Sequence, residues 1–435
     1  MLKVGLFWFT HDLRVDDNAA LARAAQEVDR LICLYCVDRP ARVGDVRHPN
    51  QLSPIRRQFQ LESLIDLNQA LQQLGQHLEI REQPPLDAIA ELITVHNISQ
   101  LYSSVHVGSY ENEVWGTLQK RYGQLSFNRL HSHTLFEPSD LPFAIQALPD
   151  SFSKFRRAIE KPALEIPSPL DSPQSLPAPC TVPDNYWQQD IINLSGLFTG
   201  GAGAAERHIR DYFNRDLASS YKQTRNGLDG MDYSTKFSPW LANGSVSARR
   251  IVEQLQDYEA RAGASDSTYW ILFELLWREY FQWYAHKFGN RLFKFSGIRE
   301  HAPTTSFYAE RFQKWCAGTT PYPIINAFMN QLNSTGYLSN RGRQLVASCF
   351  VHELNLDWRY GASYFEQQLI DYDVASNWGN WQYLAGVGAD PRGHRRFDLA
   401  KQAQIYDPDN QFVRRWGGDQ PLQPLDSVDA ADWPI

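Results

Sequence analysis

The sequence lacks a long apolar run. No stretch approaches the roughly 18 residues that a membrane-spanning helix needs, so we expect no membrane span. The apolar run at residues 2–9 ends at Thr10-His11-Asp12. Because no cleavage pattern follows, this run predicts a first strand rather than an export signal, and the expected compartment is the cytosol.

Cysteine is scarce, with five residues in a chain of 435. Cys33 and Cys36 form a single C-x-x-C motif, but a zinc site needs a second pair and a redox site needs a turn. Neither is present, so small apolar residues in a buried strand are the favoured interpretation. The odd count fits a reducing compartment, and we expect no metal site.

Positive charge is not in excess, because 42 Lys and Arg against 49 Asp and Glu give a net charge of −7. A protein that follows nucleic acid over a broad surface is expected to be basic, which leaves room only for a local basic groove. Aromatic residues are abundant, with 13 Trp, 20 Tyr and 23 Phe. They usually form core, but they also provide stacking platforms and electron relays.

Residues 2–130 alternate strand and helix patterns. Apolar runs at 4–9, 31–37, 78–80 and 101–105 are separated by stretches with helical spacing, of which 53–74 is the longest. This alternation is typical of parallel βαβ units. It predicts an N-terminal α/β domain with a doubly wound parallel sheet, which we place at residues 1–132.

The rest of the chain changes character twice. Residues 133–199 are rich in proline and predict an interdomain linker with one short helix at 151–161. From residue 200 onward, apolar and aromatic residues recur at helical spacing without strand alternation. We expect an all-α domain at 200–420, followed by a short acidic tail at 421–435.

The helical part contains four clusters of polar and aromatic residues. In the first, Tyr221 precedes the segment Ser234-Thr235-Lys236-Phe237-Ser238-Pro239. Hydroxyl and backbone N–H groups in a turn before a helix suit a phosphate, and Lys236 adds a positive charge. Taken alone, however, this cluster favours an ordinary serine-rich helix cap with proline in the first turn.

The second cluster lies on one face of a predicted helix. Glu274, Trp277, Arg278 and Phe281 follow one another at i, i+3, i+4 and i+7. A carboxylate, an indole and a guanidinium on one face can stack on a base and hydrogen-bond to it. A structural Glu274–Arg278 pair beside core aromatics explains the same spacing equally well.

The third and fourth clusters combine amides, charges and rings. The third, 333–344, suits a polar ring or a phosphate, or else a helix–helix connection with a capped start. The fourth, 369–383, brings acids and amides together with Trp378, Trp381 and Tyr383. Ordinary packing explains the fourth cluster least well.

Together, these motifs resemble the photolyase/cryptochrome family. Trp8-Phe9-Thr10-His11-Asp12-Leu13-Arg14 with Asp17-Asn18 is similar to its opening signature, and the third and fourth clusters resemble its flavin site. The segments 339–344, 376–383 and 385–388 resemble the cryptochrome DASH group in particular. The match extends from Val4 to Trp416. The family's α/β domain, long linker and helical FAD domain agree with the organisation derived above.

The resemblance implies that the helical domain binds FAD. By similarity, the FAD phosphates would be held by Tyr221, Ser234, Thr235, Lys236, Phe237 and Ser238. The ribose, the isoalloxazine and their surroundings would be contacted by Arg278, Asn340, Arg343, Asp371 and Asp373. Asn377 would lie at flavin N5, where an amide accepts a hydrogen bond from N5–H.

The resemblance also implies a pocket for damaged DNA, formed by Glu274, Trp277, Asn340, Gln344 and Tyr383. A flipped cyclobutane pyrimidine dimer would be held there and split by an electron from excited, reduced FAD. Similarity to the DASH group favours single-stranded DNA. The DNA phosphates would be contacted by a limited set of basic residues, such as Arg341, Arg392, Arg395 and Arg396.

Two further assignments follow from the resemblance. Trp381 and Trp358 match the first two members of the family's tryptophan relay, but 301–306 contains no third tryptophan. Trp315, Tyr308 and Trp270 are candidate substitutes, although a lone tryptophan otherwise indicates core packing. Glu111 resembles a contact of the folate antenna, methenyltetrahydrofolate, and a surface glutamate is an equally good interpretation.

Three functions stay open on the sequence. The favoured one is an enzyme that repairs pyrimidine dimers, which we expect to be a monomer. The alternatives are a blue-light photoreceptor that signals through a partner with little repair activity, and a nucleotide-binding α/β protein without photochemistry.

Overall fold

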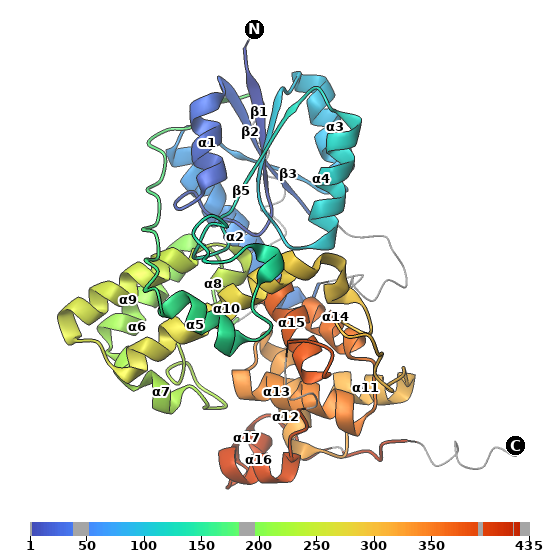
Figure 1. Ribbon diagram of the computed structural model, residues 1–435. Coiled ribbons are helices and arrows are strands. Elements are labelled where there is room, and N and C mark those ends of the chain that lie inside the picture. Colours follow the sequence, from blue (N-terminus) through green and yellow to red (C-terminus); the bar gives the residue numbers. More distant parts are fainter. Residues whose placement is uncertain (1, 38–51, 182–195, 390–394, 421, 427–435) are drawn as a thin grey trace, which may run out of the picture.

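The computed structural model describes residues 2–37, 52–181, 196–389, 395–420 and 422–426. An α/β layer built from the first third of the chain stands against a larger helical body (Figure 1). Among the described residues, no helix combines the length and the apolarity that a membrane span requires.

The N-terminal domain is a parallel sheet between helices, with strand order β3-β2-β1-β4-β5. Because the order reverses at β1, the sheet is doubly wound, as the alternation predicted. Cys33 and Cys36 are buried in β2, which confirms their structural interpretation. The elements are β1 (Val4–Phe9), α1 (Ala19–Glu27), β2 (Arg30–Cys36), α2 (Pro54–Gln73), β3 (Leu78–Arg81), α3 (Pro85–His96), β4 (Gln100–Ser104), α4 (Ser109–Arg121) and β5 (Ser126–Leu130).

The linker contributes more structure than one helix. The expected helix is present as α5 (Phe152–Glu160). In addition, β6 (Ala178–Pro179) pairs with the start of β2, while β3 pairs with its second half. The linker therefore extends the edge of the sheet, an addition that its proline content did not predict.

The second domain is helical, as expected, and among the described residues its only strand-like pairing is the isolated bridge between Ser306 and Leu356. A capping box of Ser265 and Thr268 starts the long central helix α10. The helices are α6 (Ala202–Asn214), α7 (Tyr221–Thr224), α8 (Ser238–Asn243), α9 (Ala248–Ala262), α10 (Asp266–Phe288), α11 (Ala309–Ala317), α12 (Pro323–Thr335), α13 (Asn340–Ser348), α14 (Trp358–Gln368), α15 (Val374–Leu384), α16 (Leu399–Tyr406) and α17 (Gln411–Arg415).

The opening motif after β1 joins the two domains. Arg14 is only 2% exposed and donates to the backbone carbonyls of Ser132, Asp17 and Gly244 at 2.7, 2.8 and 2.9 Å. A buried guanidinium needs such partners. Gly244 has φ +73°, and a Cβ there would lie 2.0 Å from the His11 carbonyl oxygen. The close approach of the domains therefore depends on a glycine at this position.

A second connection links α2 to α6. The carboxylates of Glu62 and Asp66 accept backbone N–H groups of Gly200, Ala202 and Gly203 at 2.7–3.3 Å. Negative charge at the start of a helix satisfies N–H groups that lack a partner within the helix. The position of α6 matters for the site, because α6 supports the loop before α8.

Candidate functional site

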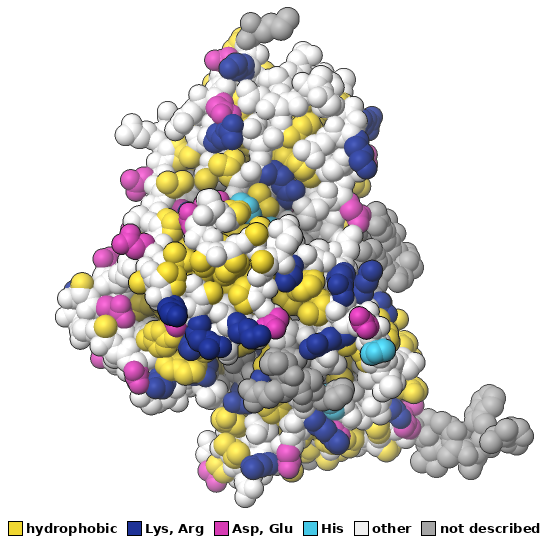
Figure 2. Space-filling model, viewed as in Figure 1, with side chains coloured by type: hydrophobic (Ala, Val, Ile, Leu, Met, Phe, Trp, Pro, Cys, Tyr) yellow, Lys and Arg dark blue, Asp and Glu magenta, His cyan; other side chains and the backbone are white. Residues whose placement is uncertain are grey.

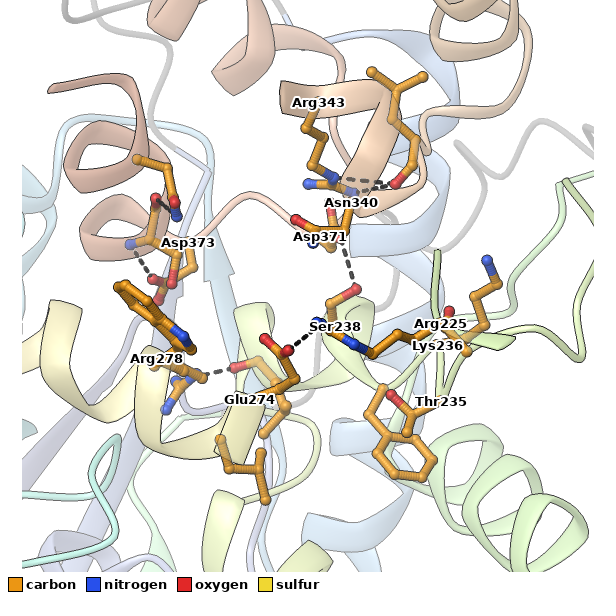
Figure 3. A pocket seen from close by; sticks show the side chains of 18 of the residues that line it. Arg225, Thr235, Lys236, Ser238, Glu274, Arg278, Asn340, Arg343, Asp371 and Asp373 are labelled. Atoms are coloured by element: carbon orange, nitrogen blue, oxygen red, sulfur yellow. Dashed lines mark hydrogen bonds and ion pairs between the residues drawn. The ribbon is translucent and has the colours of Figure 1, made fainter. Parts of the chain in front are cut away.

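A cavity of about 730 Å³ lies in the helical domain, within the range of roughly 300–1,000 Å³ that is typical of ligand sites. All four sequence clusters contribute to its wall, and Figure 3 shows their polar side chains facing one another. The predicted residues in the wall are Tyr221, Ser234, Thr235, Lys236, Phe237, Ser238, Glu274, Trp277, Arg278, Asn340, Gln344, Arg343, Asp371, Asp373 and Tyr383.

The loop before α8 is not an ordinary serine cap. No side chain caps α8, and the Ser238 hydroxyl instead donates to Asp371 Oδ2 at 2.7 Å. The cap interpretation is therefore wrong. Outside the cavity, a ring nitrogen of His208 on α6 lies 2.8 Å from the Thr235 carbonyl oxygen. Burial lowers the pKa of His208, which favours a neutral imidazole that donates to this carbonyl.

Lys236 has a left-handed backbone, with φ 55°. Its Nζ lies 3.3 Å from the ring centre of Tyr233 and 4.6 Å from that of Tyr337. Burial, together with the nearby charge of Arg343, lowers the pKa of Lys236 to about 6. The positive charge that the sequence suggested at this loop is therefore strongly disfavoured.

Glu274 on α10 pairs with a residue that the sequence analysis missed. Arg225 Nη1 donates to Glu274 Oε1 at 2.5 Å, and the Arg225 guanidinium lies 4.2 Å from the ring centre of Trp270. Arg278 does not pair with Glu274 but donates to the His133 carbonyl at 2.5 Å. The interpretation of Glu274 and Arg278 as a structural ion pair is therefore wrong. Burial raises the pKa of Glu274, and the charge of Arg225 opposes that rise.

Trp277 lies against Tyr383, at a ring-centre distance of 6.2 Å and with near-perpendicular planes. It also stacks on Phe152 of the linker helix α5, at 3.8 Å and 14°. No sequence spacing relates these two residues, which are far apart in the chain. One face of the indole is therefore covered by the protein itself.

Asp371 and Arg343 form the most buried ion pair of the cavity wall. Arg343 Nη2 donates to Asp371 Oδ2 at 2.7 Å and also to the Leu338 carbonyl at 3.0 Å. Asp371 Oδ1 is buried and has no hydrogen-bond partner in the described structure. This buried oxygen can therefore accept a hydrogen bond from a ligand group that enters the cavity.

Asn377, Trp358 and Trp381, which were predicted near the flavin or on its electron relay, lie outside the cavity lining. Asn377 Nδ2 donates to the Ala362 carbonyl at 3.0 Å, which orients the amide and leaves Oδ1 as an acceptor. Trp358 is fully buried and donates to the Phe295 carbonyl at 2.9 Å. The rings around Trp381 are those of Trp315, Phe350 and Phe365.

Glu111 is not an ordinary surface glutamate. It lies between His11 Nε2 at 3.7 Å and His106 Nδ1 at 3.4 Å, and the two imidazole rings stack at 4.7 Å. Burial opposes its charge, but the two histidines hold the pKa of Glu111 well below its usual range. Such a group can hold a metal ion. His106 Nδ1, however, already accepts the Gly108 N–H at 2.9 Å.

The cavity wall is locally basic in a chain of net charge −7. Six basic residues line it against Glu274, Asp371 and Asp373. Figure 2 shows Lys and Arg side chains gathered across the helical body on this face. The positive charge comes from Arg225, Arg278, Arg341, Arg343 and Arg395, whereas burial disfavours the charge of the sixth, Lys236.

Four residues were predicted from sequence as DNA contacts. Arg341 and Arg395 line the cavity, and Arg395 lies 4.5 Å from the ring centre of Tyr383. Arg396 is bound in a two-point pair with Glu353, at 2.9 Å for both contacts. Arg392 lies outside the described residues.

Arg225 and Tyr337 are the main site residues that sequence reasoning missed. Tyr337 lies within the third cluster, so the sequence analysis predicted its segment as part of the site but did not single out the residue. Arg225 follows Tyr221 by four positions in a short helical turn, and no motif marks it. Its role arises from the contact of α7 with α10.

Comparisons with known proteins agree with this organisation. Residues 270–419 match a model of the FAD binding domain of DNA photolyase, and residues 5–178 match a model named DNA photolyase. Cryptochrome DASH of Vibrio parahaemolyticus is 53% identical over 437 residues, which cover all of this chain and 97% of that protein. The chloroplastic/mitochondrial cryptochrome DASH of Arabidopsis thaliana is 39% identical, covering 95% and 75%.

Solved structures show the same similarity. A cryptochrome of Synechocystis sp. superposes with a TM-score of 0.87 at 37% identity, covering 96% of this chain and 89% of that one. A class III photolyase of Agrobacterium tumefaciens superposes with a TM-score of 0.80 at 25% identity, covering 96% and 86%.

Proposed function

Because the chain belongs to the photolyase/cryptochrome family, and within it to the cryptochrome DASH group, we propose that it is a light-dependent flavoprotein that repairs cyclobutane pyrimidine dimers, preferentially in single-stranded DNA. One observation carries the proposal. A single cavity joins a polar floor around Arg343 and Asp371 to an aromatic and acidic part formed by Glu274, Trp277 and Tyr383.

FAD fits the donors and acceptors of this wall. Within the part of the chain that the structure describes, Asp371 Oδ1 is a buried acceptor without a partner, and Arg278 Nε and Arg341 Nε are buried donors without one. A ligand with ribose hydroxyls, ring N–H groups and phosphates can satisfy both kinds of atom. We propose that Tyr221, Asn340, Arg343, Asp371, Asp373, Asn377 and the segment 234–238 hold it.

When bound and reduced, FAD supplies the light absorption and the electron that splits the dimer. The protein holds and orients the lesion. Glu274 and the amides of Asn340 and Gln344 offer hydrogen bonds to pyrimidine edges, while Trp277 and Tyr383 offer ring surfaces. Because burial raises the pKa of Glu274, its protonated form, which can donate, is more populated than in an exposed glutamate.

The preference for single strands follows from the cost of flipping. A dimer enters such a cavity only after it leaves the stack, and an intact duplex resists this by a few kcal/mol. Broad electrostatic attraction does not offset that cost, because the chain carries a net charge of −7 and its positive charge is local.

Two additions complete the proposal. Trp381 passes electrons to the bound flavin when that flavin is oxidised, and methenyltetrahydrofolate serves as an antenna near Glu111. Glu111 already contacts His11 and His106, and a folate would share the remaining acceptor sites of this carboxylate. Loss of folate from a Glu111→Gln protein that keeps its FAD would support this location.

The decisive test is repair by the purified protein under blue light, on matched single-stranded and duplex oligonucleotides that carry one dimer. Heat release should first yield FAD at about one per chain. We expect repair only in light, and faster repair on the single strand. A FAD-loaded protein that repairs neither substrate would favour the photoreceptor, whereas a folded protein without flavin would exclude photochemistry.

A further inference from the structure

We propose that Tyr364 is the outer member of the electron relay and that it is connected to Trp381 through Trp315. This proposal rests on the proposed function, since it requires FAD within reach of Trp381. It deepens that function by naming the residues through which an external reductant supplies electrons.

An unbroken series of ring contacts supports this path. The rings of Trp381 and Trp315 lie 6.3 Å apart between centres, and those of Trp315 and Tyr364 lie 5.5 Å apart. Trp381 is 2% exposed and Trp315 is fully buried, and Phe350 and Phe365 pack around both. Each ring therefore packs directly beside the next in a mostly apolar surrounding.

The path ends at the surface. Tyr364 is partly exposed, and its hydroxyl donates to Asn333 Oδ1 at 2.6 Å on the solvent side. Burial of the ring raises the pKa of Tyr364, so the phenol is protonated at rest. A phenol at this position can lose an electron inward and its proton outward.

The alternative path through Trp358 does not end at an exposed residue among those the structure describes. Within the described residues, the ring contact of Trp358 is with Trp378, at 5.7 Å, and both are fully buried. Trp378 Nε1 donates to the hydroxyl of Tyr372, which is 5% exposed. A reductant in solution does not reach that phenol, so this branch ends inside the protein.

The segment 301–306, where the third tryptophan was expected, contains no other side chain that could take its place in the relay. Ser306 forms a backbone bridge with Leu356, and the next residue, Phe307, stacks on Tyr360 at 4.2 Å. Phenylalanine is much harder to oxidise than tryptophan or tyrosine. Tyr360 therefore provides a matched control, because it stands on α14 one turn from Tyr364.

The electron balance of the path is simple. Trp381 gives one electron to the photo-excited oxidised flavin, Trp315 refills Trp381, and Tyr364 refills Trp315. Tyr364 then loses its phenolic proton to solvent beside Asn333 and becomes a neutral phenoxyl radical. A thiol in solution returns one electron and one proton to Tyr364, so that the net donor is the thiol.

The test compares Tyr364→Phe with Tyr360→Phe and Tyr372→Phe in the FAD-loaded protein, with electron paramagnetic resonance as the readout. Illumination without a reductant should produce a neutral tyrosyl radical in wild type, Tyr360→Phe and Tyr372→Phe, but not in Tyr364→Phe. With thiol present, Tyr364→Phe should reduce its flavin at least tenfold more slowly. Trp315→Phe should lose the tyrosyl radical signal and should also show the slower flavin reduction with thiol.

The outcomes that contradict the relay differ from those that contradict the proposed function. A FAD-loaded Tyr364→Phe protein that keeps the tyrosyl signal and the wild-type rate overturns the relay alone. Loss of the signal in Tyr372→Phe does the same and assigns the branch through Trp358 and Trp378, and its loss in Tyr360→Phe assigns the radical to Tyr360. A chain that binds no FAD overturns both this proposal and the proposed function. Tyr364→Phe removes one partly exposed oxygen atom, so it tests the path even where Trp315→Phe does not fold.

Discussion

Replacement of Trp277 by alanine tests the lesion pocket most directly. The indole lines the cavity beside Tyr383, and Phe152 covers one of its faces at 3.8 Å. Phe281 also lies beside the indole, at 5.7 Å and 26°, and we expect the ring surface that remains toward the cavity to serve a flipped base. Stacking of one base on an aromatic side chain contributes about 1–3 kcal/mol. Since about 1.4 kcal/mol is a factor of ten, Trp277→Ala should weaken lesion binding by about 5- to 150-fold.

The assay is a titration of four matched oligonucleotides, damaged and undamaged, as single strands and as duplexes, across salt concentration. Undamaged strands should bind Trp277→Ala nearly as well as wild type, because phosphate contacts are made elsewhere. With about four to six phosphates neutralised, the log–log salt slope on single strands should be about −3 to −4 in both proteins.

A matched control separates stacking from folding. Trp277→Phe keeps a ring against Phe152 and should retain most of the lesion affinity, whereas Trp277→Ala also removes packing from α5. If Trp277→Ala weakens damaged and undamaged strands alike, or if duplex and single-stranded lesions bind equally, the description of the pocket is wrong.

Three further predictions address the flavin, the relay and the fold. Asp371→Asn leaves Arg343 without its charged partner, and loss of one member of a buried pair destabilises a folded protein by about 3–5 kcal/mol. Since Arg343 is partly exposed, we expect an effect at the lower end, measured as a lower melting temperature, together with more FAD lost during gel filtration than from wild type. Trp381→Phe should slow flavin photoreduction strongly while chemically reduced protein still repairs dimers, and equal loss of both activities would instead make Trp381 a structural or lesion residue. Burial raises the pKa of Glu279 from 4.5 to about 7, so the folded state holds this proton more tightly than the unfolded state. The free energy of unfolding should therefore fall by about 3 kcal/mol as pH rises from about 5 to about 7. Glu279→Gln should flatten that decline in melting temperature, and an unchanged slope would contradict the assignment.

Local patterns in the sequence determined the fold class and the segments of the site. Strand and helix periodicity is set by neighbouring residues, so the alternation up to residue 130 predicted the doubly wound sheet that β1–β5 form. The same spacing placed Glu274, Trp277, Arg278 and Phe281 on one face of α10, and all four line the cavity. The opening motif at 8–18 and the third and fourth clusters pointed to the family, and the segments 339–344, 376–383 and 385–388 to its DASH group.

Tertiary structure alone decided which partner each of these side chains takes. Glu274 binds Arg225 rather than Arg278, Ser238 binds Asp371 rather than the start of its own helix, and Trp277 stacks on Phe152 from the linker. Hydrogen bonds and ring contacts act over a few ångströms, so their partners depend on how distant segments pack, which periodicity does not encode. The contacts of the proposed relay are decided in the same way, because Trp381, Trp315 and Tyr364 stand on three helices that meet only in the folded protein.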